Sequence, residues 1–181
     1  MIAVVGLGQR FVTGLVILGL GACSAGASAS GPRPRPGQTA ISTEGSHGSG
    51  LSATLRVPST VVQSGGRISG RITITNDTGQ ALHIDGCGGL FQVLLTSRTY
   101  HPLPFWTLCL RVFTIPIGHW TEHVQINAAY NQCGQRQATA GRPKCTPKGQ
   151  PALPPGRYTA TVFERGSELP LPAPLAVLVT R

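Results

Sequence analysis

A two-residue alternation of apolar and polar side chains runs through the chain from residue 51 onward, and no stretch sustains a helical period. The alternation is clearest over residues 67–75, where Ile68, Gly70, Ile72 and Ile74 alternate with arginine, serine and threonine. Successive side chains of a strand point to opposite faces, so the pattern predicts a strand with one buried face. A chain built on this period buries its apolar residues by packing sheets.

Further strands are predicted by the same pattern over residues 51–57, 81–84, 91–96, 110–117, 120–126, 158–162 and 175–180. Glycine- and asparagine-containing turns separate them, as at residues 64–66 and 76–79. Two prolines make residues 101–106 an edge or a loop, and residues 128–151 form a long polar loop. Seven to nine short strands with turns between them predict an all-β, antiparallel β-sandwich.

The tetrapeptide Leu20-Gly21-Ala22-Cys23 follows an apolar run of about ten residues, which is preceded by an arginine. These are the parts of a secretory signal, and the run is too short to span a bilayer, which needs about 20 residues. The tetrapeptide resembles the bacterial lipoprotein lipobox at every position. The resemblance implies that a signal peptidase recognises the first three residues and cleaves before Cys23, whose sulfur carries a diacylglycerol.

This resemblance divides the chain into three segments. Residues 1–22 are a signal peptide, and residues 23–50 are the lipidated cysteine followed by a linker rich in serine, glycine and proline. Such a composition predicts a disordered tether. Residues 51–181 form one domain, which we expect to be monomeric, extracytoplasmic and held on the bacterial cell membrane by its acyl chains. An ordinary signal peptide with a chance cysteine, or an uncleaved anchor, is the alternative.

The charge of the chain is basic but spread out. The formal net charge is +9, and +8 remains once the signal peptide is removed, because Arg10 is its only charge. Nucleic-acid binding needs a basic patch or stripe, which the sequence lacks, so no nucleic-acid partner is expected. A dispersed basic surface is either merely solvated or faces anionic lipid or a cell-envelope polymer.

Five cysteines divide into Cys23 and an even set of four. In an oxidising compartment, Cys87, Cys109, Cys133 and Cys145 predict two disulfides. Three pairings exist, and local loop sizes favour Cys87–Cys109 and Cys133–Cys145. A metal site of four thiolates is the alternative, but zinc-binding cysteines are usually two to four residues apart, so no metal is expected.

The segment His119-Trp-Thr-Glu-His123 matches the H-x-x-E-H pattern of inverted zinc peptidases. That chemistry needs both histidines on one helix face, with Glu122 as the base. Here the surrounding residues continue a two-residue period, and in a strand Glu122 points away from His119 and His123. We therefore expect a solvated strand face, and a metal-dependent hydrolase is the less favoured reading.

No nucleophile elbow, phosphate loop or dinucleotide fingerprint is present, and the chain has only six acidic residues. The sequence therefore predicts no enzyme activity and no cofactor. Trp106, Trp120 and Tyr158 are expected in the core or at its rim, with a sugar-binding platform as the alternative. The predicted function is non-catalytic binding of a protein or cell-envelope polymer, through the cysteine-bearing loops and residues 100–106.

A second resemblance covers residues 51–181. Asn76 after the strand at residues 71–75, and Leu153-Pro-Pro-Gly-x-Tyr158 before a late strand, resemble bacterial immunoglobulin-like domains. The nearest family is the intracellular proteinase-inhibitor domain, which is a sandwich with a similar order of motifs. The resemblance implies an immunoglobulin-like sandwich, and it makes extracytoplasmic protease inhibition the alternative function.

Overall fold

The structure is a computed structural model. It describes residues 40–43, 50–86, 88–107, 111–134, 142–166 and 169–181, all within one unit, Arg33–Arg181. These residues form strands and contain no helix, and hence none that could cross a membrane. The all-β prediction is confirmed.

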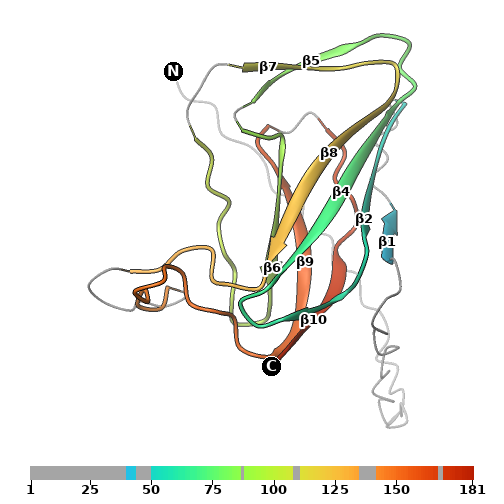
Figure 1. Cartoon of the computed structure of the whole chain (residues 1–181). Helices are drawn as coiled ribbons and strands as arrows, with labels where there is room; N and C mark the ends of the chain where they lie inside the picture. Colours follow the sequence, from blue (N-terminus) through green and yellow to red (C-terminus); the bar gives the residue numbers. More distant parts are fainter. Residues whose placement is uncertain (1–39, 44–49, 87, 108–110, 135–141, 167–168) are drawn as a thin grey trace, which may run out of the picture. The chain divides into compact units, whose positions relative to one another are not determined.

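Ten strands are formed by the described residues (Figure 1). They are β1 Ala40–Thr43, β2 Leu51–Val57, β3 Val61–Gln63, β4 Arg67–Asn76, β5 Leu82–Gly86, β6 Phe91–Thr96, β7 Arg111–Ile115, β8 Gly118–Asn127, β9 Gly156–Glu164 and β10 Leu175–Thr180.

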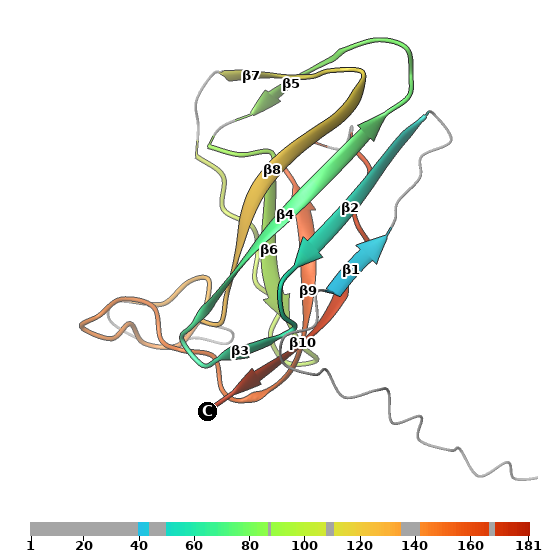
Figure 2. The same cartoon turned by 45° about the vertical axis from the view of Figure 1, so that its right-hand side comes forward.

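Eight of these strands form one sheet in the order β1-β2-β4-β8-β6-β9-β10-β3, and β5 pairs with β7 in a second, small sheet. Figure 2 shows β1, β2, β4 and β8 side by side. The long strand β4 pairs antiparallel with β2 on one side and with β8 on the other. The residues at its alternating positions, Ile68, Gly70, Ile72 and Ile74, are all buried as predicted.

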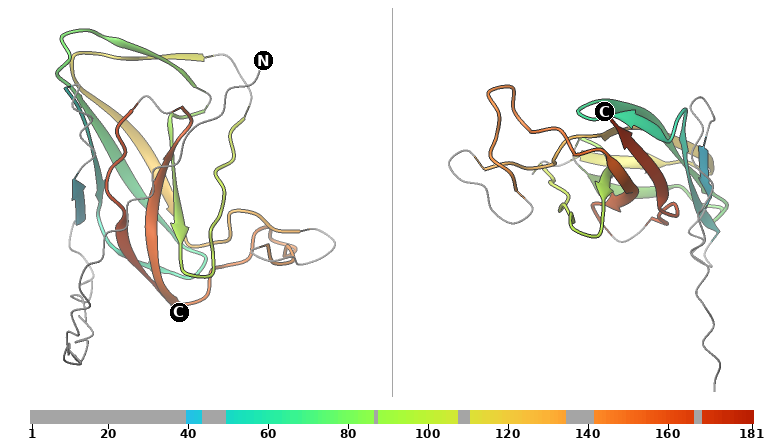
Figure 3. Two further views of the ribbon diagram at one scale, coloured as in Figure 1. Left: turned by 180° about the vertical axis from the view of Figure 1, so that it is seen from behind. Right: turned by 90° about the horizontal axis from the view of Figure 1, so that it is seen from below.

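The large sheet curls, so that β2, β4 and β8 face β6, β9 and β10 across one core (Figures 1 and 3). A single register pair, Val93 with Ile126, joins the two halves between β6 and β8. The largest fully buried side chains include Leu55 and Ile72 from the first half and Val177 and Val179 from the second. Apolar residues thus come from alternating positions on both halves, as a period-two pattern requires.

The pairing differs from the antiparallel prediction at two places. Strand β6 runs parallel to β8 at its single pair, and β3 runs parallel to β10. Strand β3 has only three residues and follows β2 closely, so its short pattern was not recognised in the sequence. It covers the outer edge of β10, where its pairing adds one strand to the second half of the sheet.

One further strand lies within the segment that was predicted as a linker. Ala40–Thr43, inside the linker predicted over residues 23–50, form β1 and pair antiparallel with β2. Backbone pairing to an existing strand edge does not require an apolar pattern, which is why composition alone missed β1.

The turn after β4 is fixed by a buried amide. Asn76 is 0% exposed, and its Nδ2 donates to the carbonyl oxygens of Gln80 at 2.8 Å and Pro116 at 3.1 Å. Its Oδ1 accepts hydrogen bonds from the backbone N and Oγ1 of Thr78 at 3.1 and 2.7 Å. One side chain therefore ties the β4–β5 turn to the β7–β8 turn.

Candidate functional site

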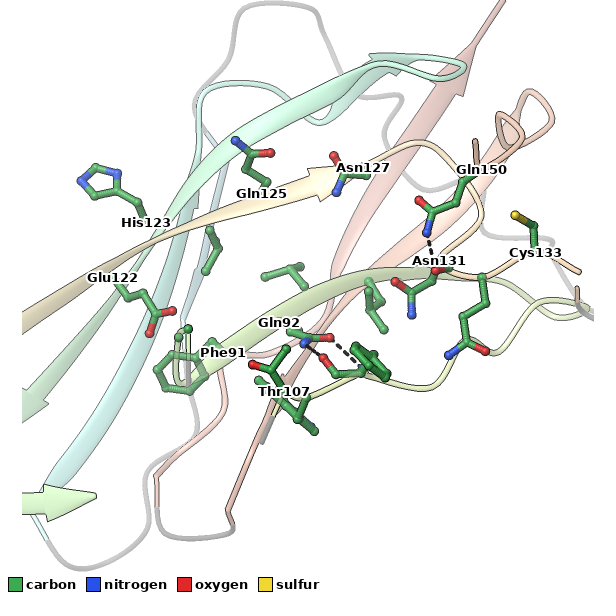
Figure 4. A pocket seen from close by; sticks show the side chains of 18 of the residues that line it. Phe91, Gln92, Thr107, Glu122, His123, Gln125, Asn127, Asn131, Cys133 and Gln150 are labelled. Atoms are coloured by element: carbon green, nitrogen blue, oxygen red, sulfur yellow. Dashed lines mark hydrogen bonds between the residues drawn. The ribbon is translucent and has the colours of Figure 1, made fainter. Parts of the chain in front are cut away.

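A groove of about 980 Å³ lies where β6 and β8 meet, and residues from both faces of these strands line it (Figure 4). Segments 105–107 and 131–133, together with Arg142 and Gln150, form its walls. Six side-chain amides line it, and they come from both strands and from the long loop: Gln92, Gln125, Asn127, Asn131, Gln132 and Gln150.

Strand alternation places the floor of this groove. Val93 and Ile126 are paired and buried, so their sequence neighbours on β6 and β8 point outward. Gln92 and Leu94 are therefore half-buried on the outer face of β6, while Gln125 and Asn127 are exposed on β8. The same alternation that builds the core thus presents polar side chains to the groove.

One wall is an extended segment held by side-chain amides. Gln92 Nε2 donates to the Phe105 carbonyl oxygen, and Phe105 N donates to Gln92 Oε1 at 3.1 Å, so one amide engages both backbone groups. Asn131 Nδ2 donates to the Leu103 carbonyl oxygen at 2.8 Å. Residues 103–105 are thereby fixed at two points, although Leu103 and Phe105 are 71% and 66% exposed.

The opposite wall is the long loop, which a disulfide closes. Cys133 and Cys145 are bonded, with their Cα atoms 5.0 Å apart, so this predicted pair is confirmed. Two further bonds position the loop: Gln150 Nε2 donates to the Asn131 carbonyl oxygen at 2.7 Å, and Asn131 N donates to the Tyr100 hydroxyl at 2.6 Å. The ring of Tyr100 packs edge-on against Tyr130, with centroids 4.9 Å apart.

The carboxylate of Glu122 closes one end of the groove. Its Oε2 accepts a hydrogen bond from Leu90 N at 3.0 Å. Gly89 leaves room for it, because a Cβ atom at that position would overlap Glu122 Oε1. Burial raises the pKa of Glu122, and hydrogen bonds from the backbone amides of Leu90 and Phe91 oppose that rise. The carboxylate replaces backbone pairing where β6 and β8 diverge.

The structure separates the residues of the H-x-x-E-H segment. The segment lies in strand β8, as predicted, with His119 and His123 exposed and Glu122 half-buried on the opposite face. His119 Nδ1 lies 3.1 Å from Thr75 Oγ1 on the neighbouring strand. Glu122 is occupied with the backbone of Leu90, so the three side chains do not converge on one point. No group of three metal-ligating side chains is found among the described residues.

Aromatic side chains lie around the groove and loop as well as in the core. Trp106, predicted at the core or its rim, is half-buried in the groove wall beside Phe105. Trp120 and Tyr158 are half-buried and pack against the core. Tyr158 donates from its hydroxyl to the Pro154 carbonyl oxygen at 2.9 Å.

The amide cluster was not predicted from the sequence. Gln92, Gln125 and Asn127 stand at the polar positions of two predicted strands, and this was the available signal. Their convergence depends on β6 lying next to β8, and 21 residues of sequence, which include β7, separate these two strands. Local pattern does not specify that neighbour relationship.

Several predicted site residues lie outside the described part of the chain. They are the lipobox residues Leu20, Gly21, Ala22 and Cys23, and the predicted disulfide partners Cys87 and Cys109.

Comparison of the chain with protein-family models, with curated proteins and with solved structures gave no match.

Proposed function

We propose that the protein is a lipid-anchored extracytoplasmic binding protein whose single domain uses the amide-lined groove to hold its partner non-covalently. The observation that carries the binding role is the groove itself, a volume of about 980 Å³ with six side-chain amides and fixed walls. Concave sites with a few convergent polar groups are where proteins hold ligands. The lipobox at Leu20-Gly21-Ala22-Cys23 supports the anchor.

The domain is best described as an immunoglobulin-like sandwich. Three features support this: each half of the curled sheet is antiparallel apart from the edge strand β3, the halves face each other across one core, and they share only one register pair. Tyr158 is the third residue of the penultimate strand, and its hydroxyl donates a hydrogen bond to the backbone four residues upstream. That arrangement resembles the tyrosine corner of immunoglobulin-like domains.

The anchor is tested by replacing Cys23. The full chain expressed in a bacterium that processes lipoproteins should enter the detergent phase on phase separation, and its mature N-terminus should be Cys23 carrying diacylglycerol by mass spectrometry. Cys23→Ser should move the protein to the aqueous phase and abolish the lipid mass. Cys133→Ser is the matched control, because it removes another cysteine without touching the lipobox. Unacylated Cys23 in the mature protein would refute the anchor.

Protease inhibition is the second candidate, and the wall segment 103–105 favours it. Leu103 and Phe105 are exposed large apolar side chains on an extended backbone that Gln92 and Asn131 hold in place. A rigid, exposed, extended segment can occupy a protease cleft with little loss of conformational entropy. Inhibition of a panel of secreted proteases should then be weakened by Phe105→Ala. Leu171→Ala, at another exposed apolar side chain, should leave it unchanged.

A further inference from the structure

The amides of the groove divide into two sets by the bonds they already make. Gln92, Asn131 and Gln150 hold the walls. The side chains of Gln125 and Asn127 make no hydrogen bond to another described residue and are exposed over the floor. A side-chain amide offers two donors and one acceptor with two lone pairs. Gln125 and Asn127 can thus both donate hydrogen bonds to a ligand and accept hydrogen bonds from it.

The floor carries no charge. Gln92, Leu94, Gln125 and Asn127, which β6 and β8 contribute, are all neutral. The acidic residue of the lining, Glu122, turns its carboxylate to the backbone of Leu90. Arg142 belongs to the loop wall, and His123 is exposed on β8. A charged polymer would therefore find few opposite charges along the floor, although the chain as a whole is basic.

An added peptide strand would need free backbone groups, and on β6 the side that faces β9 has none. Strand β6 pairs with β9 along its whole length. On the other side, Glu122 accepts from the amides that begin β6, and Gln92 holds the backbone of Phe105 beside the strand. Strand addition depends mainly on main-chain hydrogen bonds, and at the start of β6 those are already taken, so we argue the ligand from the side chains that line the groove.

Neutral amides and aromatic side chains that line one groove match the chemistry of a sugar chain. Sugar hydroxyl groups both donate and accept hydrogen bonds, as amides do, and the C–H faces of sugar rings pack on aromatic surfaces such as Trp106 and Phe105 in the wall. We propose that the groove binds an uncharged polysaccharide chain. This inference rests on the proposed function, since it names the class of partner that the anchored domain holds.

The test measures binding of soluble uncharged polysaccharides to the full chain. Glucans, mannans, galactans and arabinans would be titrated by calorimetry against protein kept in a detergent without a sugar head group. At least one should bind saturably. Binding should persist when salt rises from about 0.1 to about 0.5 M, because no ion pair is involved. Gln125→Ala combined with Asn127→Ala should weaken binding by about tenfold or more, from the loss of neutral hydrogen bonds at both positions.

Gln63→Ala is the matched control, because Gln63 is an exposed amide on β3 outside the groove. It should bind like the wild type. The proposal is overturned if no uncharged polysaccharide binds, if the control loses as much affinity as the groove variant, or if only an acidic polymer such as polygalacturonate binds and high salt releases it. Saturable binding of extended peptides alone would also overturn it. Partition of the same preparation into the detergent phase tests the anchor separately. If the protein enters the detergent phase but binds no polysaccharide, only this inference is refuted.

Discussion

Asn76→Asp is the substitution that tests the packing of the sheet ends most sharply. The change replaces the Nδ2 donor with an oxygen that would face the carbonyl oxygens of Gln80 and Pro116, in a side chain that is 0% exposed. Three hydrogen bonds from Nδ2 are lost, including one at 3.4 Å to the buried carbonyl oxygen of Ile115, and each unsatisfied or repulsive contact between oxygens in such a site costs about 1–3 kcal/mol. We expect a loss of about 4 kcal/mol, which is large against the total stability of about 5–15 kcal/mol that a domain of this kind has.

Urea unfolding followed by tryptophan fluorescence measures this loss. With a slope of about 2 kcal/mol per molar urea, the midpoint should fall by about 2 M. The deficit should shrink at acidic pH, because the ring of carbonyl oxygens favours the protonated carboxyl in the folded state and so raises its pKa. Asn127→Asp is the control: it is exposed and makes no side-chain hydrogen bond to a described residue, so it should change stability by less than about 0.5 kcal/mol. Equal stability of the Asn76→Asp variant and the wild type would refute the donor role of Nδ2.

Three further predictions concern the groove. Cys133→Ser should open the loop of 13 residues from Cys133 to Cys145 and lower the free energy of unfolding by about 3 kcal/mol. Limited proteolysis should then cut within residues 134–144 before it cuts the strands. Gly89→Ala should displace the Glu122 carboxylate and cost about 1–3 kcal/mol, seen as a lower urea midpoint; an unchanged midpoint would contradict the close approach. Glu122→Gln should remove a contribution to the pH dependence of stability. Because the pKa of Glu122 is raised in the folded state, wild-type stability should fall as pH rises from the ordinary carboxyl pKa through the raised one. Urea midpoints measured at about pH 4 and pH 7 should show this contribution in the wild type and not in the variant.

Residues in strands could be predicted because their signal is local. The strands at Phe91–Thr96 and Leu175–Thr180 match the predicted ranges, and the buried positions of β4 follow from its alternation. The Cys133–Cys145 pair was predictable because a short loop brings its ends together at low entropic cost. Strands β1 and β3 were missed, since each forms by pairing with the edge of a strand and carries little pattern of its own.

The sequence by itself determined the all-β class and the buried face of each long strand, because these depend on residues close together in the chain. Only the tertiary structure decided which strands are neighbours. It brought Gln92 beside Gln125 and Asn127, turned Glu122 toward Leu90 and pinned Phe105 to β6. The physical reason is that side-chain period fixes the face on which a residue lies, whereas the contacts across that face depend on how the sheet curls around its shared core.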